Sequence, residues 1–246
     1  MKLLLTTQAD DNIKDITDIT HPIFKQFAKK WKADFFVINT PSLCYETVGY
    51  YNETDHYRIL NIYDLYEDYD RILYLDSDMI INEHCPNIFD IVPYDTIGVA
   101  HEDKGSRESN RLERIKLIQD QFGDINWKEG YPNNGTLITS KAHRDIFSSI
   151  NGNWWLGPGY DCLLLGYQIN RLQYPIQELS FKWNHMTMFS ESWHNHASRF
   201  ESYIIHYAGQ GVFDSNVLNR TEQIKKDYIY NKIKQANISF KSEQGE

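Results

Sequence analysis

The feature of this sequence that most restricts its fold is a pair of carboxylates directly after an apolar run. Residues 72–75 read Ile-Leu-Tyr-Leu, Asp76-Ser77-Asp78 follows, and residues 79–81 are apolar again. The run indicates a strand that is buried on both faces. Carboxylates at the end of such a strand are costly unless they are paired or bind a metal. The same spacing at Asp68 and Asp70 lies in a polar segment, where we expect a solvated turn.

Apolar runs that suit buried strands alternate with amphipathic stretches, which favours an α/β fold with a mainly parallel, mixed sheet flanked by helices. We expect strands at 2–7, 34–39, 71–75, 97–100, 137–139 and 203–206. We expect helices at 57–66, 107–122, 160–171 and 221–235, and others that begin at Ile13 and Lys141. Pro22 predicts that the helix beginning at Ile13 restarts at this proline. Residues 133–135, Asn-Asn-Gly, have the composition of a turn.

Ligands of such sheets bind beyond the carboxyl ends of the strands, so Thr6 and Thr7 should lie in one crevice with the acidic pair. In an extended chain Asp76 and Asp78 point the same way and can bind a hard cation, which leaves positions for phosphate oxygens. Such a cation neutralises the charge that develops on a diphosphate leaving group. The pattern therefore predicts a metal–diphosphate site.

The net charge of -9 argues against binding to nucleic acid or to an anionic membrane, and it requires a local cation beside any anionic ligand. Three cysteines at positions 44, 85 and 162 have neither zinc-site spacing nor an even number for a disulfide framework. No window approaches the roughly 20 apolar residues of a membrane span, and the first residues lack the pattern of a signal peptide. We expect a cytoplasmic protein.

Residues 71–81 resemble the DxD strand of the glycogenin-like retaining glycosyltransferases. Further motifs of that family follow in the same order. Residues 133–135 resemble its Asn-Ser-Gly segment, Asp161-Cys162 its Asp-Gln motif, and Trp183-Asn184 its Tyr-Asn pair. Residues 204–209 resemble its late His-x-x-Gly segment. The likeness extends over residues 2–211.

The resemblance implies a single GT-A domain, the Rossmann-like fold of nucleotide-diphospho-sugar transferases, over residues 1–240, with a frayed tail at 241–246. It implies Mn²⁺, or Mg²⁺, and a UDP-sugar donor. A hexosyl group would pass with retention to a hydroxyl of a glycan, a protein or a small molecule. The implied metal ligands are Asp76, Asp78 and His206, and the implied catalytic residues are Asp161 and Asn133. The implied donor-binding residues are Thr6, Thr7, Ala9, Ser77, Asn134, Gly135 and Gly209.

Two positions depart from the family pattern. Val212 stands where the family has a lysine that contacts the diphosphate, and Arg58 is our candidate to replace that charge. Cys162 stands in place of the glutamine that follows the acidic residue. We also expect Trp154, Trp155 and Tyr160 to be candidates for an acceptor pocket, although a tryptophan pair suits a core equally well.

Two alternatives remain open at this stage. A haloacid-dehalogenase-type phosphohydrolase also places Asp-x-Asp after an apolar strand, but near the start of the chain and with a later lysine and acidic pair. A carbohydrate-binding module with a degenerate glycosyltransferase fold would explain both departures. Turnover of a nucleotide sugar distinguishes the transferase from either alternative.

Overall fold

The computed structural model describes residues 1–42 and 54–243, so Cys44 lies outside the described part of the chain. A central sheet has six strands in the order β2-β1-β3-β6-β5-β7. Their bounds are β1 (Leu3–Gln8), β2 (Asp34–Ile38), β3 (Arg71–Leu75), β5 (Ile97–His101), β6 (Pro132–Ser140) and β7 (Ile176–Glu178). β1 pairs parallel with β2 and β3, and β5 pairs parallel with β7. β6 alone runs antiparallel to its neighbours, so the predicted mainly parallel mixed sheet is confirmed.

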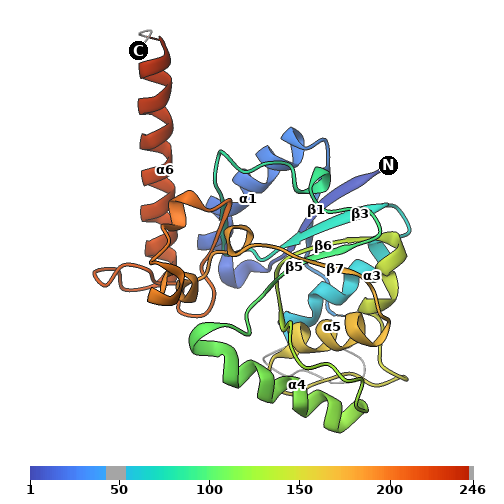
Figure 1. Cartoon of the computed structure of the whole chain (residues 1–246). Coiled ribbons are helices and arrows are strands. Elements are labelled where there is room, and N and C mark those ends of the chain that lie inside the picture. The colour runs from blue at the N-terminus through green and yellow to red at the C-terminus, as the bar shows by residue number, and fades with distance from the viewer. Residues whose placement is uncertain (43–53, 244–246) are drawn as a thin grey trace.

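Helices cover both faces of this sheet (Figure 1). They are α1 (Lys14–Lys30) on one face, and α3 (Ile62–Leu65), α4 (Glu108–Phe122) and α5 (Tyr160–Arg171) on the other. Helix α6 (Arg220–Glu243) packs against α1 and projects away from the sheet. Strand residues alternate between two hydrophobic clusters. Leu4 and Ile72 pack toward α3, α4 and α5, whereas Leu5 and Leu73 pack toward α1. None of the helices in the described part combines the length and apolar character needed to cross a bilayer.

Helix α1 differs from the prediction because it is continuous through Pro22. Proline removes one backbone hydrogen bond from a helix. Phe24 and Phe27, directly after Pro22, are buried against the sheet together with Trp31. This burial on one stripe holds the helix together across the proline. Helix α6 also extends past the predicted end at residue 235 and reaches the first three residues of the expected tail.

Two predicted helices are largely 3₁₀ helices, at Thr54–Asn61 and Lys141–Phe147. The first continues into the short α3. A 3₁₀ helix has three residues per turn, so it aligns side chains spaced by three. Tyr57 and Leu60 have this spacing in the first segment, as His143 and Ile146 have in the second, and all four are buried. The remaining 3₁₀ helices are Asp11–Ile13, Ile88–Asp90, Gly105–Arg107, Phe181–Trp183, Thr187–Ser190, Ser192–His194 and Arg199–Glu201.

The predicted turn at 133–135 is wrong, because these residues belong to β6. The strand contains a large bulge instead. Val99 pairs with Leu137 but Ala100 pairs with Asn133, so residues 134–136 are extra residues opposite β5. The carbonyl of Gly135 accepts a hydrogen bond from the Asp76 amide at 2.9 Å. The bulge therefore brings the Asn-Asn-Gly segment beside the acidic pair.

A second, two-stranded sheet lies at the end of β3. It consists of β4 (Met79–Ile81) and β8 (Ile204–His206), which pair antiparallel with Met79 opposite His206. The Tyr207 amide donates to the Asp78 carbonyl at 3.0 Å. This register places the late histidine next to the acidic pair, although more than a hundred residues separate them in the sequence.

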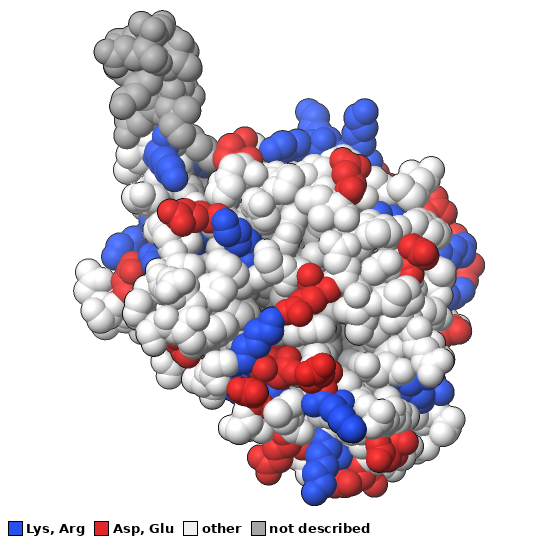
Figure 2. Space-filling model, viewed as in Figure 1, with Lys and Arg blue, Asp and Glu red and all other residues white. Residues whose placement is uncertain are grey.

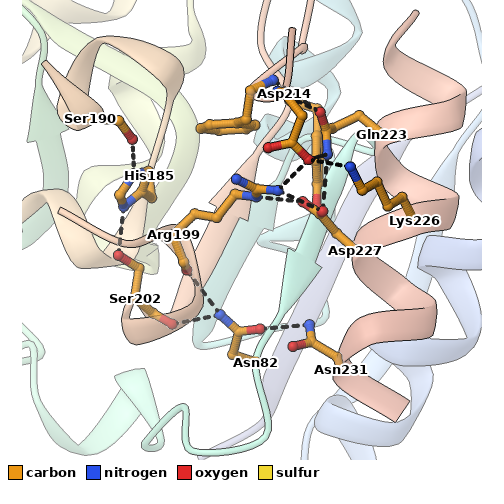
Figure 3. A network of polar contacts seen from close by, with 12 residues as sticks. Asn82, His185, Ser190, Arg199, Ser202, Asp214, Gln223, Lys226, Asp227 and Asn231 are labelled. Atoms are coloured by element: carbon orange, nitrogen blue, oxygen red, sulfur yellow. Dashed lines mark hydrogen bonds and ion pairs between the residues drawn. The ribbon is translucent and has the colours of Figure 1, made fainter. Parts of the chain in front are cut away.

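Helix α6 is joined to this small sheet by a buried polar network (Figure 3). The Asp227 carboxylate, 1% exposed, accepts from Arg199 at 2.7 and 2.9 Å. It also accepts from the Tyr207 hydroxyl at 2.8 Å and from Gln223 at 3.0 Å. A buried carboxylate is stable only when hydrogen bonds and a counter-charge satisfy it, and this one has both. The network fixes the position of α6 relative to β8.

Replacing Asp227 with alanine should destabilise the protein by about 3–5 kcal/mol, because it leaves the Arg199 charge without its main partner in a buried site. The matched control is Lys226→Ala, whose exposed ammonium contacts Asp214 and should contribute under about 1 kcal/mol. Urea denaturation followed by circular dichroism measures both. Equal midpoints for the two variants would contradict the structural role of Asp227.

Candidate active site

A cavity of about 270 Å³ lies beyond the carboxyl ends of the central strands. Gln8, Asp76 and Glu102, which follow or end β1, β3 and β5, all line it. A second cavity of about 200 Å³ adjoins it beside β1 and shares several lining residues. The shared residues are Gln8, His56, Asp76, Asp78 and Arg220. The predicted crevice at the ends of the strands therefore exists.

Three side chains converge at the boundary of the two cavities. Ligand atoms of Asp76, Asp78 and His206 all lie within 4.8 Å of one another. The His206 Nε2 atom is 3.4 Å from an oxygen of each aspartate. Two carboxylates and an imidazole suit Mn²⁺ or a similar divalent ion. The residues that the sequence predicts as metal ligands thus lie together with a suitable geometry.

Hydrogen bonds to amides fix the orientation of the His206 ring. The Gly135 amide donates to Asn133 Oδ1 at 3.0 Å, and this oxygen also accepts from Asn184 Nδ2 at 2.9 Å. The Oδ1 atom of Asn184 must therefore be the one that faces His206 Nδ1, at 2.7 Å. An amide oxygen can only accept, so Nδ1 carries a proton, and Nε2 is the nitrogen that faces the two aspartates. Burial alone would lower the pKa of His206, but the Asp78 and Asp76 carboxylates raise it. A cation bound here would take the place of the proton on Nε2, while Nδ1 stays bonded to Asn184.

Gly135 is required by the packing of this histidine. A Cβ atom there would lie 2.5 Å from His206 Cε1 and 2.7 Å from Met79 Cε. Gly135 has an ordinary backbone conformation, so the constraint is the close approach of the ring rather than the dihedral angles. The sequence segment predicted to lie at the donor sugar therefore also forms the surface on which His206 rests.

Arg220, the first residue of α6, donates to the second oxygen of Asp78 at 2.7 Å. Burial by itself would raise the pKa of Asp78, but the charges of His206 and Arg220 outweigh it and lower this pKa to about 2. Asp78 therefore stays ionised. Asp76 differs, because burial raises its pKa and the Tyr74 hydroxyl is its hydrogen-bond donor at 2.9 Å.

Asp161 lies in the first turn of α5 and lines the larger cavity. Burial raises the pKa of its carboxyl to about 6, and the Asn134 amide donates to it at 3.1 Å. Cys162 accepts from the backbone amide of Asn134 at 3.5 Å. Burial raises the pKa of the Cys162 thiol well above its usual range, so the thiol stays neutral. The Cys162 departure therefore adds no charge to the site.

The other predicted donor-binding residues are divided between the cavities and the core. Gly209 lines the larger cavity and Ser77 the smaller one. Thr6 is fully buried and donates to the Phe36 carbonyl, and Thr7 bonds Ser77 Oγ at 2.9 Å. Ala9 is 8% exposed and is not among the residues that line these two cavities.

Arg58 lies away from the residues that line either cavity. Its guanidinium makes ion pairs with Asp10 at 3.0 Å and with Asp55 at 2.6 Å. Arg220, by contrast, lines both cavities and contacts Asp78. No local pattern indicated this, because Arg220 only precedes the helix predicted at 221–235. Glu102 carried a signal that was missed, since it follows an apolar strand with only His101 between them.

The aromatic candidates for an acceptor pocket also separate. Tyr160 lines the larger cavity and stacks on His56 with ring centroids 4.8 Å apart. Trp155 is buried, and its indole nitrogen donates to the Pro158 carbonyl at 3.3 Å. Trp154 packs partly buried against the same core. Both tryptophans therefore pack in the hydrophobic core, and neither lines the two cavities.

Solved structures with low sequence identity have the same fold. A glycosyltransferase involved in glycosylation of the major capsid of PBCV-1 has a TM-score of 0.61 at 14% identity, over 92% of this chain and 98% of that one. The bifunctional glycosyltransferase WbbM has a TM-score of 0.61 at 14% identity, over 94% of this chain and 49% of that one. The galactosyltransferase LgtC, in complex with donor and acceptor sugar analogs, has a TM-score of 0.57 at 13% identity, over 93% and 94%. No protein of curated function matches the sequence.

These neighbours show that the chain has a GT-A fold. A sequence model of glycosyl transferase family 8 matches residues 2–134, more than half of the chain. The chain belongs to this family. The membership favours the transferase over the phosphohydrolase alternative. The matched region includes Asp76, Asp78 and Asn133 but ends before Asp161 and His206.

Replacing Asn184 with alanine should weaken Mn²⁺ binding by about 10–100-fold, because the His206 ring loses the acceptor that holds its tautomer and orientation. Titration calorimetry with Mn²⁺ measures the change. Asn82→Ala is the matched control, since Asn82 is a buried amide that bonds the carbonyls of Arg199 and Ser202 and does not touch His206. Unchanged Mn²⁺ affinity in Asn184→Ala would contradict the proposal that Asn184 orients the His206 ring.

Asp161 should make stability fall as pH rises. Its folded-state pKa of about 6 lies above the ordinary aspartate value of 3.8, so the folded protein binds the proton more tightly. The cost of ionising it in place is absent at pH 4 and fully present above pH 6. Asp161→Asn should therefore gain about 2 kcal/mol of stability at pH 8 relative to pH 4, measured by urea denaturation in EDTA. The exposed Asp120→Asn should show no such difference; equal shifts for both variants would contradict the prediction.

Proposed function

We propose that this family 8 enzyme transfers a hexosyl group from a UDP-sugar to a hydroxyl acceptor, with retention of anomeric configuration. The observation that carries the proposal is the Asp76–Asp78–His206 cluster at the boundary of two cavities. One cavity would hold the nucleoside and the other the sugars. The bond between the anomeric carbon and the diphosphate oxygen breaks, and the acceptor oxygen bonds to that carbon. The proton of the acceptor hydroxyl passes to the departing diphosphate, and UDP leaves.

The three clustered side chains would hold Mn²⁺, or Mg²⁺, which neutralises charge on the diphosphate as it leaves. The ionised state of Asp78 and the position of His206 Nε2, which faces both aspartates, support this role. Asn184 and Asn133 act through His206 and keep its ring in position. This hydrogen-bonded support gives a preorganised site, because the ligands need not rearrange when an ion enters.

The diphosphate also needs a side-chain cation, since Val212 removes the one that the family pattern has. We assign this role to Arg220. Its aliphatic stem crosses Gly211, where a Cβ atom would lie 2.8 Å from Arg220 Cγ. Its guanidinium uses one N–H on Asp78 and lines both cavities, so other donors of the planar fork remain for phosphate oxygens.

The smaller cavity has the chemistry expected for a uracil base. Ile13 and Ile16 give it apolar walls, and Gln8 adds an amide. Gln8 Oε1 is buried and has no hydrogen-bond partner among the described residues. Uracil presents an N–H donor flanked by two carbonyl acceptors, which an amide side chain can match. The ring would satisfy an atom that is otherwise costly to bury.

In the larger cavity, Asp161 would face the transferred sugar. Above a pH of about 6 it is ionised, so it can stabilise positive charge that develops on the sugar ring. Asn134 supports it, because its amide donates to the carboxylate while its own Oδ1 is buried without a partner in the described part of the chain. Retention is the outcome that the family resemblance implies.

The first test is turnover of UDP-hexoses with Mn²⁺, measured as UDP release, and product configuration by NMR. Asp78→Ala should lower kcat/KM by at least about 100-fold, because the leaving group loses its charge stabilisation. Asp68→Ala, in the same spacing but at an exposed position, should retain full activity. Absence of turnover and of UDP binding in the wild type would refute the proposal and favour a non-catalytic module.

Arg220→Gln should weaken UDP binding by about 10-fold or more while changing Mn²⁺ affinity much less, because it removes a phosphate contact rather than a metal ligand. Arg58→Gln is the matched control. Its guanidinium is held by Asp10 and Asp55, so UDP affinity should change little. Calorimetric titration with UDP in Mn²⁺ separates the two arginines, and a larger loss in Arg58→Gln would reverse the assignment.

A further inference from the structure

We infer that the larger cavity takes an acidic saccharide, whose carboxylate or phosphate binds Arg107 and Arg114. The inference rests on the proposed function and names a substrate class for it. Three arginines reach this cavity from the start of α4 and the turn before it, at positions 107, 111 and 114. Spacings of four and three residues place them on one face of a helical segment.

This group of arginines belongs to the sugar side of the site. None of the three lines the smaller cavity beside β1, which Arg220 and Gln8 line. Arg111 and Arg114 lie beside Tyr131. The Tyr131 hydroxyl in turn lies against Gly159, where a Cβ atom would be 2.4 Å away. Gly159 immediately precedes the helix that carries Asp161, so these arginines adjoin the residue proposed to face the transferred sugar.

Arg111 already has its partners. Its guanidinium forms an ion pair with Glu102 and lies over the Tyr131 ring, 5.1 Å from its centroid. Glu102 in turn accepts from Asn133 Nδ2 at 3.0 Å. Through Glu102, Arg111 therefore links Asn133, which helps to orient the His206 ring, to this wall of the cavity. Its charge is neutralised, and its role is to hold the wall in place.

Arg107 and Arg114 differ from Arg111 and Arg220, the other arginines that line the larger cavity. Neither makes an ion pair with a described residue, although the protein has 34 acidic side chains, many of which lie on the face shown in Figure 2. Arg58, Arg111, Arg144, Arg199 and Arg220 all make one. Glu191 is near Arg107, but its two oxygens accept from Ser106 and Trp193. Two half-buried cations thus lack a counter-ion, and both line the cavity.

An uncompensated, half-buried charge is costly, and an anionic ligand would offset that cost. Neutral sugars offer only hydroxyl groups to these guanidinium groups. A uronic acid carboxylate or a sugar phosphate offers paired oxygens that match the planar fork of arginine. The anionic group can belong to the transferred sugar of the donor or to the acceptor. Both sources present the same chemistry to Arg107 and Arg114.

The experiment compares acidic and neutral ligands of the same size on the full chain with Mn²⁺. The donor arm measures kcat/KM and affinity for UDP-glucuronate against UDP-glucose, and for the two galacto equivalents. The acceptor arm measures binding of a methyl glucuronide against a methyl glucoside in the presence of UDP. Arg107→Gln and Arg114→Gln are the test variants. Lys116→Gln, on an exposed position of the same helix, is the charge-matched control.

We expect one arm to favour the acidic ligand by at least 10-fold, which also identifies the source of the anion. Each arginine variant should lose most of that preference, while UDP affinity and the neutral ligand are unaffected and Lys116→Gln behaves as wild type. Ratios within threefold in both arms, or a preference that survives both variants, would overturn the inference. UDP binding is measured separately. If the wild-type protein does not bind UDP, the result contradicts the proposed function and not the choice of an acidic saccharide.

Discussion

The antiparallel pairing of β4 with β8 is the constraint on which the site depends. It sets Met79 opposite His206 and holds the Tyr207 amide on the Asp78 carbonyl. A slip of one residue would turn the His206 ring to the opposite face of the strand. The buried Arg199–Asp227 pair then keeps α6 against this sheet and so positions Arg220. The positions of the candidate metal ligands therefore depend on the pairing of β4 with β8, and the position of Arg220 depends on how α6 packs against β8.

Much of the fold could be predicted because its signals are local. A run of four apolar residues before Asp76 marks a buried strand, and residues 160–171 form the predicted helix at the predicted bounds. Order along the chain was enough to relate Asp78 to His206 through a family resemblance, and these residues do lie together. Pattern reasoning succeeds where one residue's environment depends on its near neighbours.

The remainder depended on partners that are distant in the sequence. Asn133–Gly135 has turn composition, but pairing with β3 and β5 makes it a bulged strand. Arg58 is our sequence candidate for the diphosphate contact, but its guanidinium forms ion pairs with Asp10 and Asp55, which no local pattern indicated. No local rule could indicate that Arg220 crosses Gly211 to reach Asp78, because that contact joins residues 142 positions apart.

That separation also has a consequence for synthesis. The ribosome releases Asp76 and Asp78 long before His206, Arg220 and the helix that holds them exist. Because nonlocal contacts form late, the nascent chain exposes an acidic strand end without the histidine that completes it. The cluster of Asp76, Asp78 and His206 can therefore assemble only after the chain has been translated through β8, and its contact with Arg220 only after α6 has followed.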